Sequence, residues 1–257
     1  MAEWTNEKYS MLDPRTHTER DREYARRMEA YFSHSLGTNM DKLRHFAKFV
    51  PRQVLAKFLA KCELFQHVLG VHGHILECGV YLGDGLLTWA QLSSIYEPVN
   101  HLRRIVGFDT FTGFPEVTEK DKGDNKDRAL PGELAAHAYD DLMECLELYD
   151  LNRPLGHIPR VEAVAGDALQ TIPEYVRKNP HLVVALLYLD FDLYEPTKLA
   201  IETFLPRMPK GAVLAFDELC QAQWPGETLA VMETAGLSNL RIRRFPFTPQ
   251  LSYAVLE

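Results

Sequence analysis

The stretch LLYLDFDLYEPT, residues 186–197, holds two carboxylates, Asp190 and Asp192, directly after a long apolar run. Carboxylates at the end of a buried strand can hold a divalent cation or take a proton from a substrate, although a solvated turn has the same appearance. Acids follow other apolar runs in the same way, and their number is hard to explain by helix capping alone. These acids are Glu77, Asp109, Asp167 and Asp217.

The elements that must position these acids alternate along the chain. Apolar runs are separated by segments with helical periodicity, and this alternation predicts a mostly parallel sheet covered by helices on both faces. Ligands of such a sheet bind beyond the carboxyl ends of the strands, where the acids fall. Two C-terminal runs, LRIRRFPF and PQLSYAVLE, are joined too closely for a crossover helix and predict an antiparallel hairpin. The apolar runs occupy residues 74–79, 104–109, 161–166, 182–190 and 211–217.

Two amphipathic helices are predicted ahead of the first strand, at residues 20–33 and 52–69. We therefore expect an N-terminal helical extension over residues 1–70 and one α/β domain over residues 71–257. The extension is richer in aromatic and apolar residues than a solvated segment requires. We interpret this excess as the interface of a homo-oligomer.

Composition excludes several classes of protein. The 257 residues carry a formal net charge of -8, which argues against a protein that coats nucleic acid. The N-terminus has no apolar signal region, and no run approaches the roughly 20 apolar residues of a membrane span, so we expect no membrane association and a cytoplasmic location. The 4 cysteines form no CxxC pair, which fits reduced thiols better than zinc or disulfides.

A glycine-rich turn, ECGVYLGDG, follows the first predicted strand. Glycines there let the backbone approach a ligand, and the start of the next helix favours a negative group. Three residues separate Gly79 from Gly83, so the turn is wider than a dinucleotide fingerprint. Asp109 lies 24 residues beyond Gly85, a distance at which an acid commonly binds a ribose diol. The pattern indicates an adenosine ligand with a carboxylate-bearing group.

In order and spacing, the motifs LECGVYLGDG, GFDTFTGFP, AGDA, LDFDLYEPT and FDELCQAQWPGET resemble the macrocin-type, metal-dependent S-adenosylmethionine O-methyltransferases. The resemblance covers about residues 70–257. It implies a Rossmann-like class I methyltransferase fold, with a mostly parallel seven-stranded sheet that ends in the antiparallel hairpin. The chain is most similar to the branch that methylates TDP-linked 6-deoxysugars, such as TDP-rhamnose at the 3-hydroxyl, in enediyne biosynthesis.

The resemblance also implies a role for each acid. Asp192 would be the general base, and a divalent metal, Mg²⁺ or Mn²⁺, would join S-adenosylmethionine as a cofactor. The sequence departs from the family at one position, since many members have two aspartates where this chain has Asp217 and Glu218. The implied cofactor-binding residues are Glu77, Gly79, Gly83, Asp109, Asp167 and Asp190, and the implied metal ligands are Asp190, Asp217 and Glu218.

These roles suit the residue types. Ligands that are all carboxylate oxygens select a hard cation such as Mg²⁺ over Zn²⁺. A cation lowers the pKa of a sugar hydroxyl, while a neighbouring carboxylate accepts its proton. Asp190 and Asp192 would share one face if the strand stays extended through Phe191, because side chains alternate along a strand.

Other functions remain open from the residues alone. A nucleotide-sugar glycosyltransferase also uses an Asp-x-Asp motif to hold a metal, but it gives no reason for Glu77, the glycine turn or Asp109. A hydride-transferring Rossmann enzyme explains the turn and leaves Asp190, Asp217 and Glu218 without a purpose. A non-enzymatic module that binds an adenosyl ligand would tolerate the site without using it.

A long polar loop at residues 112–133 exceeds the ordinary length of a connection, and we interpret it as a lid over the acceptor. The diphosphate of a nucleotide-sugar acceptor would need cationic partners. Candidates in this loop and near the C-terminus are Lys120, Lys122, Lys126, Arg128, Arg241, Arg243 and Arg244, each of which is also explained as a solvated surface charge.

Overall fold

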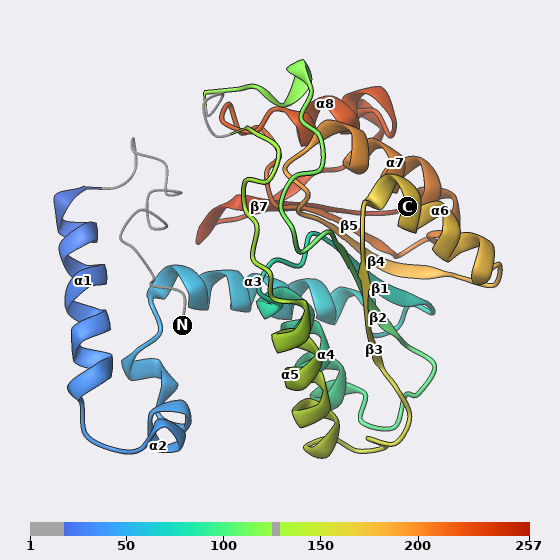
Figure 1. Cartoon of the computed structure of the whole chain (residues 1–257). Coiled ribbons are helices and arrows are strands. Elements are labelled where there is room, and N and C mark those ends of the chain that lie inside the picture. Colours follow the sequence, from blue (N-terminus) through green and yellow to red (C-terminus); the bar gives the residue numbers. More distant parts are fainter. Residues whose placement is uncertain (1–17, 125–128) are drawn as a thin grey trace. The chain divides into compact units, whose positions relative to one another are not determined.

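The structure is a computed structural model that describes residues 18–124 and 129–257 (Figure 1). The described residues form two compact units that divide between Leu55 and Ala56. Helix α3 (Arg52–Val68) crosses from the first unit into the second. The boundary predicted at residue 70 remains a prediction. In the described ranges, no helix combines the length and apolarity needed to cross a bilayer.

The N-terminal unit contains the first predicted helix, whereas the second, at residues 52–69, is α3 and lies mostly in the other unit. Helix α1 (Glu19–His34) and helix α2 (Asn39–Arg44) each begin at a threonine whose capping box closes the first turn, and the 3-10 helix η2 (Phe46–Lys48) follows. Within the described part of this unit, α1 buries none of its side chains. The rings of Tyr31 and Phe32 contact Phe49, whose side chain is largely buried.

Seven strands of the described residues form one sheet in the order β3-β2-β1-β4-β5-β7-β6 (Figure 1). Strands β1 to β5 run parallel, and β7 runs antiparallel to both β5 and β6. The predicted parallel sheet and its C-terminal hairpin are confirmed. The strands are β1 (His74–Cys78), β2 (Ile105–Asp109), β3 (Val161–Ala165), β4 (Val184–Leu189), β5 (Val213–Phe216), β6 (Arg243–Phe245) and β7 (Thr248–Val255).

Helices cover both faces of the sheet, as near-continuous apolar strands require. Side chains alternate along β4, so Tyr188 packs in one core with Phe65 and Trp89, while Leu187 packs in the other core with Phe204. Helix α3 lies on the first face with α4 (Asp84–Tyr96) and α5 (Tyr139–Leu151), and the second face carries α6 (Ala168–Lys178), α7 (Tyr194–Phe204) and α8 (Gly226–Glu233) (Figure 1).

The order of strands reverses at β1, which lies between β2 and β4. Ligands of open α/β sheets bind at this switch point, beyond the carboxyl ends of the strands. Cys78 at the end of β1 pairs with Phe108 and with Leu189, and Leu189 pairs with Phe216. Because these terminal residues are in register, the acids that end or follow β2, β4 and β5 emerge at one edge of the sheet.

Candidate active site

Strands β4 and β5 each lead into a carboxylate at the switch-point edge. The N–H of Asp190 donates to the carbonyl of Cys78 at 2.7 Å, and the N–H of Asp217 donates to the carbonyl of Leu189 at 3.0 Å. The ladder therefore continues one residue past each strand and holds the two aspartates in neighbouring positions. Asp217 is 2% exposed and Glu218 is 9% exposed, so both are taken out of water.

The backbone at Asp192 differs from the extended form on which the predicted common face depended. β4 ends at Leu189, and Asp192 has φ of 62°, in the left-handed region. A non-glycine residue there carries a backbone strain of about 1 kcal/mol, which aspartate tolerates better than most residues. The pKa of Asp192 still responds to the charge of Asp217, so this bend leaves its carboxylate beside the other acids.

The carboxylates at this edge repel one another, and together we call them the acid cluster: Asp190, Asp192, Asp217 and Glu218. Burial and the charge of Asp217 raise the pKa of Asp190 well above its usual range. The same two causes raise the pKa of Asp192 to about 7, while burial and Asp192 raise the pKa of Glu218 to about 10. Such shifts mean that burial, and then mutual repulsion, disfavour the charged forms of these carboxylates.

Asp217 is the member of the cluster that already has partners. The Lys57 ammonium lies 2.9 Å from its Oδ2, and the Tyr188 hydroxyl donates to its Oδ1 at 2.6 Å. Burial would raise the pKa of Asp217, but these two contacts outweigh burial and lower it. Neither Lys57 nor Tyr188 was among the residues predicted from the sequence. A lysine within the amphipathic pattern of α3 was the available signal.

Glu77 lies inside the protein, where it forms an ion pair. Its side chain is 2% exposed, and its Oε1 lies 2.8 Å from the ammonium of Lys61, which also sits over the ring of Tyr188. Its Oε2 is buried and has no hydrogen-bond partner among the described residues. A Cβ at Gly85 would lie 1.9 Å from Glu77 Oε1, so this glycine makes room for the buried pair.

The glycine turn is held by Asp109 and packed against Asp190. Asp109 Oδ2 accepts the N–H groups of Val80 at 2.7 Å and Tyr81 at 2.8 Å. Its Oδ1 accepts the N–H of Phe111 at 2.6 Å, which leaves about one acceptor position of the carboxylate for a ligand. Gly79 has φ of 99°, and a Cβ there would lie 2.0 Å from the carbonyl oxygen of Asp190.

Two predicted cofactor-binding residues lie at helix starts. Gly83 is the N-cap of α4 with φ of 91°. Asp167 is the N-cap of α6, where its carboxylate accepts the N–H of Leu169 at 2.9 Å. Capping accounts for an acid after β3. The predicted role of Asp167 at the adenine ring remains a prediction.

The long loop is fastened beside the acid cluster by Asp121, which is 1% exposed. Asp121 Oδ1 accepts the N–H of Tyr194, the first residue of α7, at 2.6 Å. A Cβ at Gly226 would lie 2.6 Å from the same oxygen. Asp121 thus caps a helix that begins two residues after Asp192. In the sequence, only the Thr118-x-x-Asp121 capping pattern pointed to this residue.

Glu227 is a further carboxylate that sequence reasoning missed. It is fully buried, and its Oε1 accepts the N–H of Glu218 at 3.0 Å. Burial and the charge of Asp217 raise its pKa well above the usual range. Glu227 belongs to the motif FDELCQAQWPGET, and its place in that motif was the available signal in the sequence.

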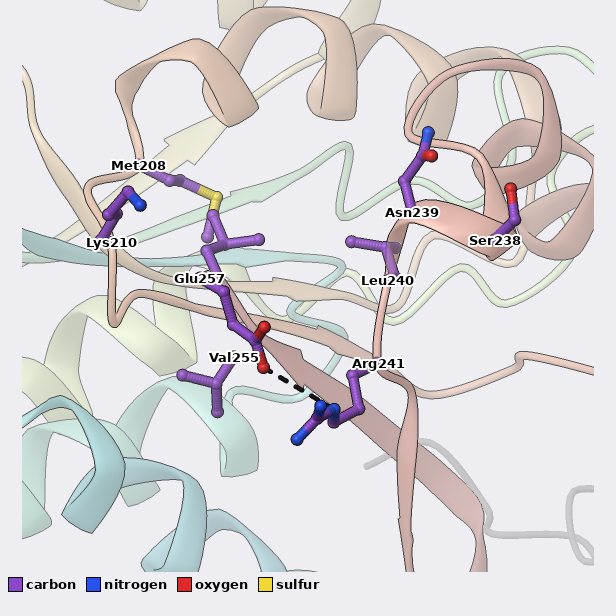
Figure 2. Close-up of a pocket in the computed structure, with 9 residues that line it drawn as sticks. Met208, Lys210, Ser238, Asn239, Leu240, Arg241, Val255 and Glu257 are labelled. Atoms are coloured by element: carbon purple, nitrogen blue, oxygen red, sulfur yellow. Dashed lines mark ion pairs between the residues drawn. The ribbon is translucent and has the colours of Figure 1, made fainter.

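The cationic candidates are mostly engaged elsewhere. Lys120 pairs with Glu233 at 2.7 Å and Lys122 pairs with Glu119, while Lys126 and Arg128 lie outside the described residues. Arg241 lines a pocket at the amino end of β5, opposite the acid cluster, where it lies 3.6 Å from Glu257 (Figure 2). Arg243 and Arg244 are exposed on β6.

The donor chemistry of the acid cluster suits a hard divalent cation, because its ligands are carboxylate oxygens with surplus negative charge. The arrangement of the side chains does not match a complete metal site. Across residues 18–124 and 129–257, no group of three His, Cys, Asp or Glu side chains is arranged to hold a metal ion. In this arrangement Asp217 is engaged by Lys57 instead.

The mostly parallel sheet and its antiparallel β6–β7 hairpin form the Rossmann-like fold of methyltransferases that use S-adenosylmethionine. The chain belongs to the macrocin O-methyltransferase (TylF) family, which it matches over residues 6–233. Family membership favours methyl transfer over the glycosyltransferase alternative.

Solved structures agree with this assignment. The chain is similar to CalS11, a calicheamicin methyltransferase, with 37% identity over 93% of each chain and a TM-score of 0.89. An apo structure of CalS11, described as a TDP-rhamnose 3'-O-methyltransferase, gives 36% identity over 93% of this chain and 95% of that one, with a TM-score of 0.80. The O-methyltransferase NovP shares the fold, at 20% identity over 78% and 79% of the chains and a TM-score of 0.63. No curated protein sequence matches the chain.

Proposed function

We propose that the chain transfers the methyl group of S-adenosylmethionine to the 3-hydroxyl of a TDP-linked 6-deoxysugar, such as TDP-rhamnose, in natural-product biosynthesis. The observation that carries this proposal is the acid cluster beside the glycine turn. The similarity to CalS11 supports the choice of acceptor, since that enzyme is described as a TDP-rhamnose 3'-O-methyltransferase.

The donor would occupy the switch point. Glu77 Oε2, buried without a partner among the described residues, suits the ammonium of the methionine moiety. Asp109 retains an acceptor position for a ribose hydroxyl. Gly79 and Gly83 would line the methionine end of the donor, and Asp167 would lie at its adenine ring. Asp190 would lie between the donor and the metal ion.

Asp190, Asp217 and Glu218 would hold Mg²⁺ or Mn²⁺ beside the acceptor. When bound, such an ion lowers the pKa of the sugar hydroxyl and fixes its position. Asp192 would then accept the hydroxyl proton. The sugar oxygen attacks the methyl carbon, the carbon–sulfur bond breaks, and its electron pair returns to sulfur. The products are a methyl ether, neutral S-adenosylhomocysteine and protonated Asp192.

A methyl-transfer assay with labelled donor tests the proposal across TDP-deoxysugars, with free sugars and finished glycosides as controls. We expect transfer to TDP-rhamnose and loss of turnover in Asp192→Asn, which keeps the size of the side chain but removes the base. Calorimetry of Asp192→Asn with S-adenosylhomocysteine should give wild-type affinity. Absence of donor binding in the wild type would refute the function, whereas an unchanged rate in Asp192→Asn would refute only the base.

We also propose that the chain forms a homo-oligomer through its N-terminal unit. This unit leaves large apolar side chains exposed, among them Phe32, Leu36, Met40 and Leu43. Monomeric soluble proteins rarely leave such side chains uncovered in contiguous patches. Light scattering should give at least twice the 29.4 kDa of one chain, and a monomeric mass would exclude the proposal.

A further inference from the structure

Lys57 supplies a positive charge to a cluster that is otherwise negative. Its ammonium lies 2.9 Å from Asp217 Oδ2. Asp217 adjoins Glu218 in the chain, and Asp190 and Asp217 follow the paired strands β4 and β5. One lysine thus faces several carboxylates at the place where a divalent ion would be expected.

The two lysines of α3 that face the switch point differ in how firmly they are held. Lys61 is 7% exposed and lies over the rings of both Trp89 and Tyr188, so its ammonium is enclosed. The side chain of Lys57 is 40% exposed while its partner Asp217 is 2% exposed. A long flexible side chain with such access to water can leave its partner and remain solvated. Lys57 therefore has the access to water that a displaced ammonium requires, whereas Lys61 does not.

We propose that Lys57 is a tethered counter-ion: it occupies the cation position of the acid cluster in the ligand-free protein, and a divalent metal ion displaces it. This inference rests on the metal site of the proposed function. The exchange breaks no covalent bond, because protonated Lys57 moves into solvent as the ion binds the carboxylates it leaves.

The exchange explains two observations together. The donor chemistry suits a hard cation, and one carboxylate of the set is paired with an ammonium that water can reach. With Lys57 on Asp217, one carboxylate of the set is engaged and the repulsion among the others is reduced. Release of Lys57 frees Asp217 at the moment when the incoming charge replaces that of the lysine, so the cluster is never without a cation.

Calorimetric titration with Mn²⁺ at pH 8 tests the exchange on the full chain. Lys57→Met removes the competing charge, and we expect Mn²⁺ to bind at least about tenfold more tightly, as the coupling of close charge pairs implies. Lys57→Arg keeps the charge and should remain near the wild-type affinity. Lys120→Met is the matched control, since Lys120 is 43% exposed and lies 2.7 Å from Glu233, outside the cluster. Its Mn²⁺ affinity should equal that of the wild type.

Two further measurements keep the test decisive if a variant folds poorly. The melting temperature of Lys57→Met in EDTA should fall below that of the wild type, and Mn²⁺ should remove the difference. In the wild type, amine acetylation read by mass spectrometry should increase several-fold at Lys57 when Mn²⁺ is added, while Lys120 should not change.

The possible outcomes separate the inference from the proposed function. Equal Mn²⁺ affinities in wild type and Lys57→Met, with acetylation of Lys57 unaffected by metal, would refute the counter-ion role of Lys57. The proposed metal site would still stand. Absence of Mn²⁺ binding in both proteins would overturn the metal site itself.

Discussion

The two ends of the sheet carry different ionisable groups. Strands β4 and β5 lead into Asp190 and Asp217 at the carboxyl end, whereas His74 begins β1 and Arg103 and Arg104 precede β2 at the amino end. The pKa shifts mirror each other. Burial and like charge raise the pKa of Asp190 at one end, while burial and the charge of Arg104 lower the pKa of His74 to about 4 at the other.

The ends differ in how completely their charges are partnered. At the amino end, Arg103 donates from Nε to Glu97, from Nη1 to the Gly73 carbonyl and from Nη2 to the carbonyls of Val68 and Val71. At the carboxyl end, the pKa values of Asp190, Asp192 and Glu218 stay raised even with Lys57 present. Partnered charges stabilise the fold, whereas buried carboxylates with raised pKa values are typical of a ligand site.

The largest expected effect follows from substituting a carboxylate of the acid cluster whose pKa is raised. Asp190→Asn should lower methyl transfer by about 10³-fold or more, because a ligand and a charge are lost at the reacting centre. The folded protein should keep or raise its melting temperature, since the raised pKa of Asp190 means that its charge opposes folding at neutral pH. Initial rates and thermal melts measure both. A loss of both stability and activity would show that the charge of Asp190 stabilises the fold, as the charge of Arg103 does.

Arg103→Met should have the reverse profile at the amino end. It removes the guanidinium contacts to Glu97 and to three carbonyl groups, and we expect the free energy of unfolding to fall by about 3 kcal/mol. Urea unfolding measures the loss. The folded enzyme should bind S-adenosylhomocysteine with wild-type affinity, and a specific loss of donor binding at unchanged stability would break the distinction between the two ends.

Asp121→Ala should give a mixed result, because this residue partners backbone next to the acid cluster. The buried N–H of Tyr194 loses its acceptor, which costs about 2 kcal/mol of stability. Turnover should fall about tenfold through displacement of Asp192, with the donor's KM unchanged. Asp121→Asn retains an acceptor oxygen for Tyr194 and should recover much of both. Wild-type turnover in Asp121→Ala would show that Asp192 is positioned without the loop.

The smallest effect concerns pH at the amino end. Because the pKa of His74 falls from 6.5 to about 4 on folding, its stabilising contribution is present above pH 6.5 and is lost as pH falls toward 4. Allowing for its partial exposure, about 1 kcal/mol should be lost between pH 7 and pH 5. His74→Asn should remove that part of the pH dependence in urea unfolding. An identical slope in both proteins would mean that His74 ionises freely.

Local patterns predicted the fold and the edge at which the acids gather. Apolar runs fixed the strands, and the absence of room for a crossover helix predicted the β6–β7 hairpin. The bend at Asp192 was not predictable from residue alternation, because the contacts beside it come from Asp121, more than 70 residues earlier, and from Gly226. Lys57 and Lys61 were missed for the same reason, since an amphipathic pattern shows which face of α3 is buried but not which acids it meets.

The packing of Gly79 against Asp190 limits how this enzyme can be altered. A single methyl group at residue 79 would overlap the backbone that carries Asp190, so the turn and the acidic strand end behave as one rigid part. Engineering of acceptor preference therefore has to leave this part unchanged and work on segments beyond the sheet edge. Libraries that vary residues 219–225, between Glu218 and α8, or residues of the loop after β2 other than Asp121, would explore new acceptors while keeping Asp217 and Glu218.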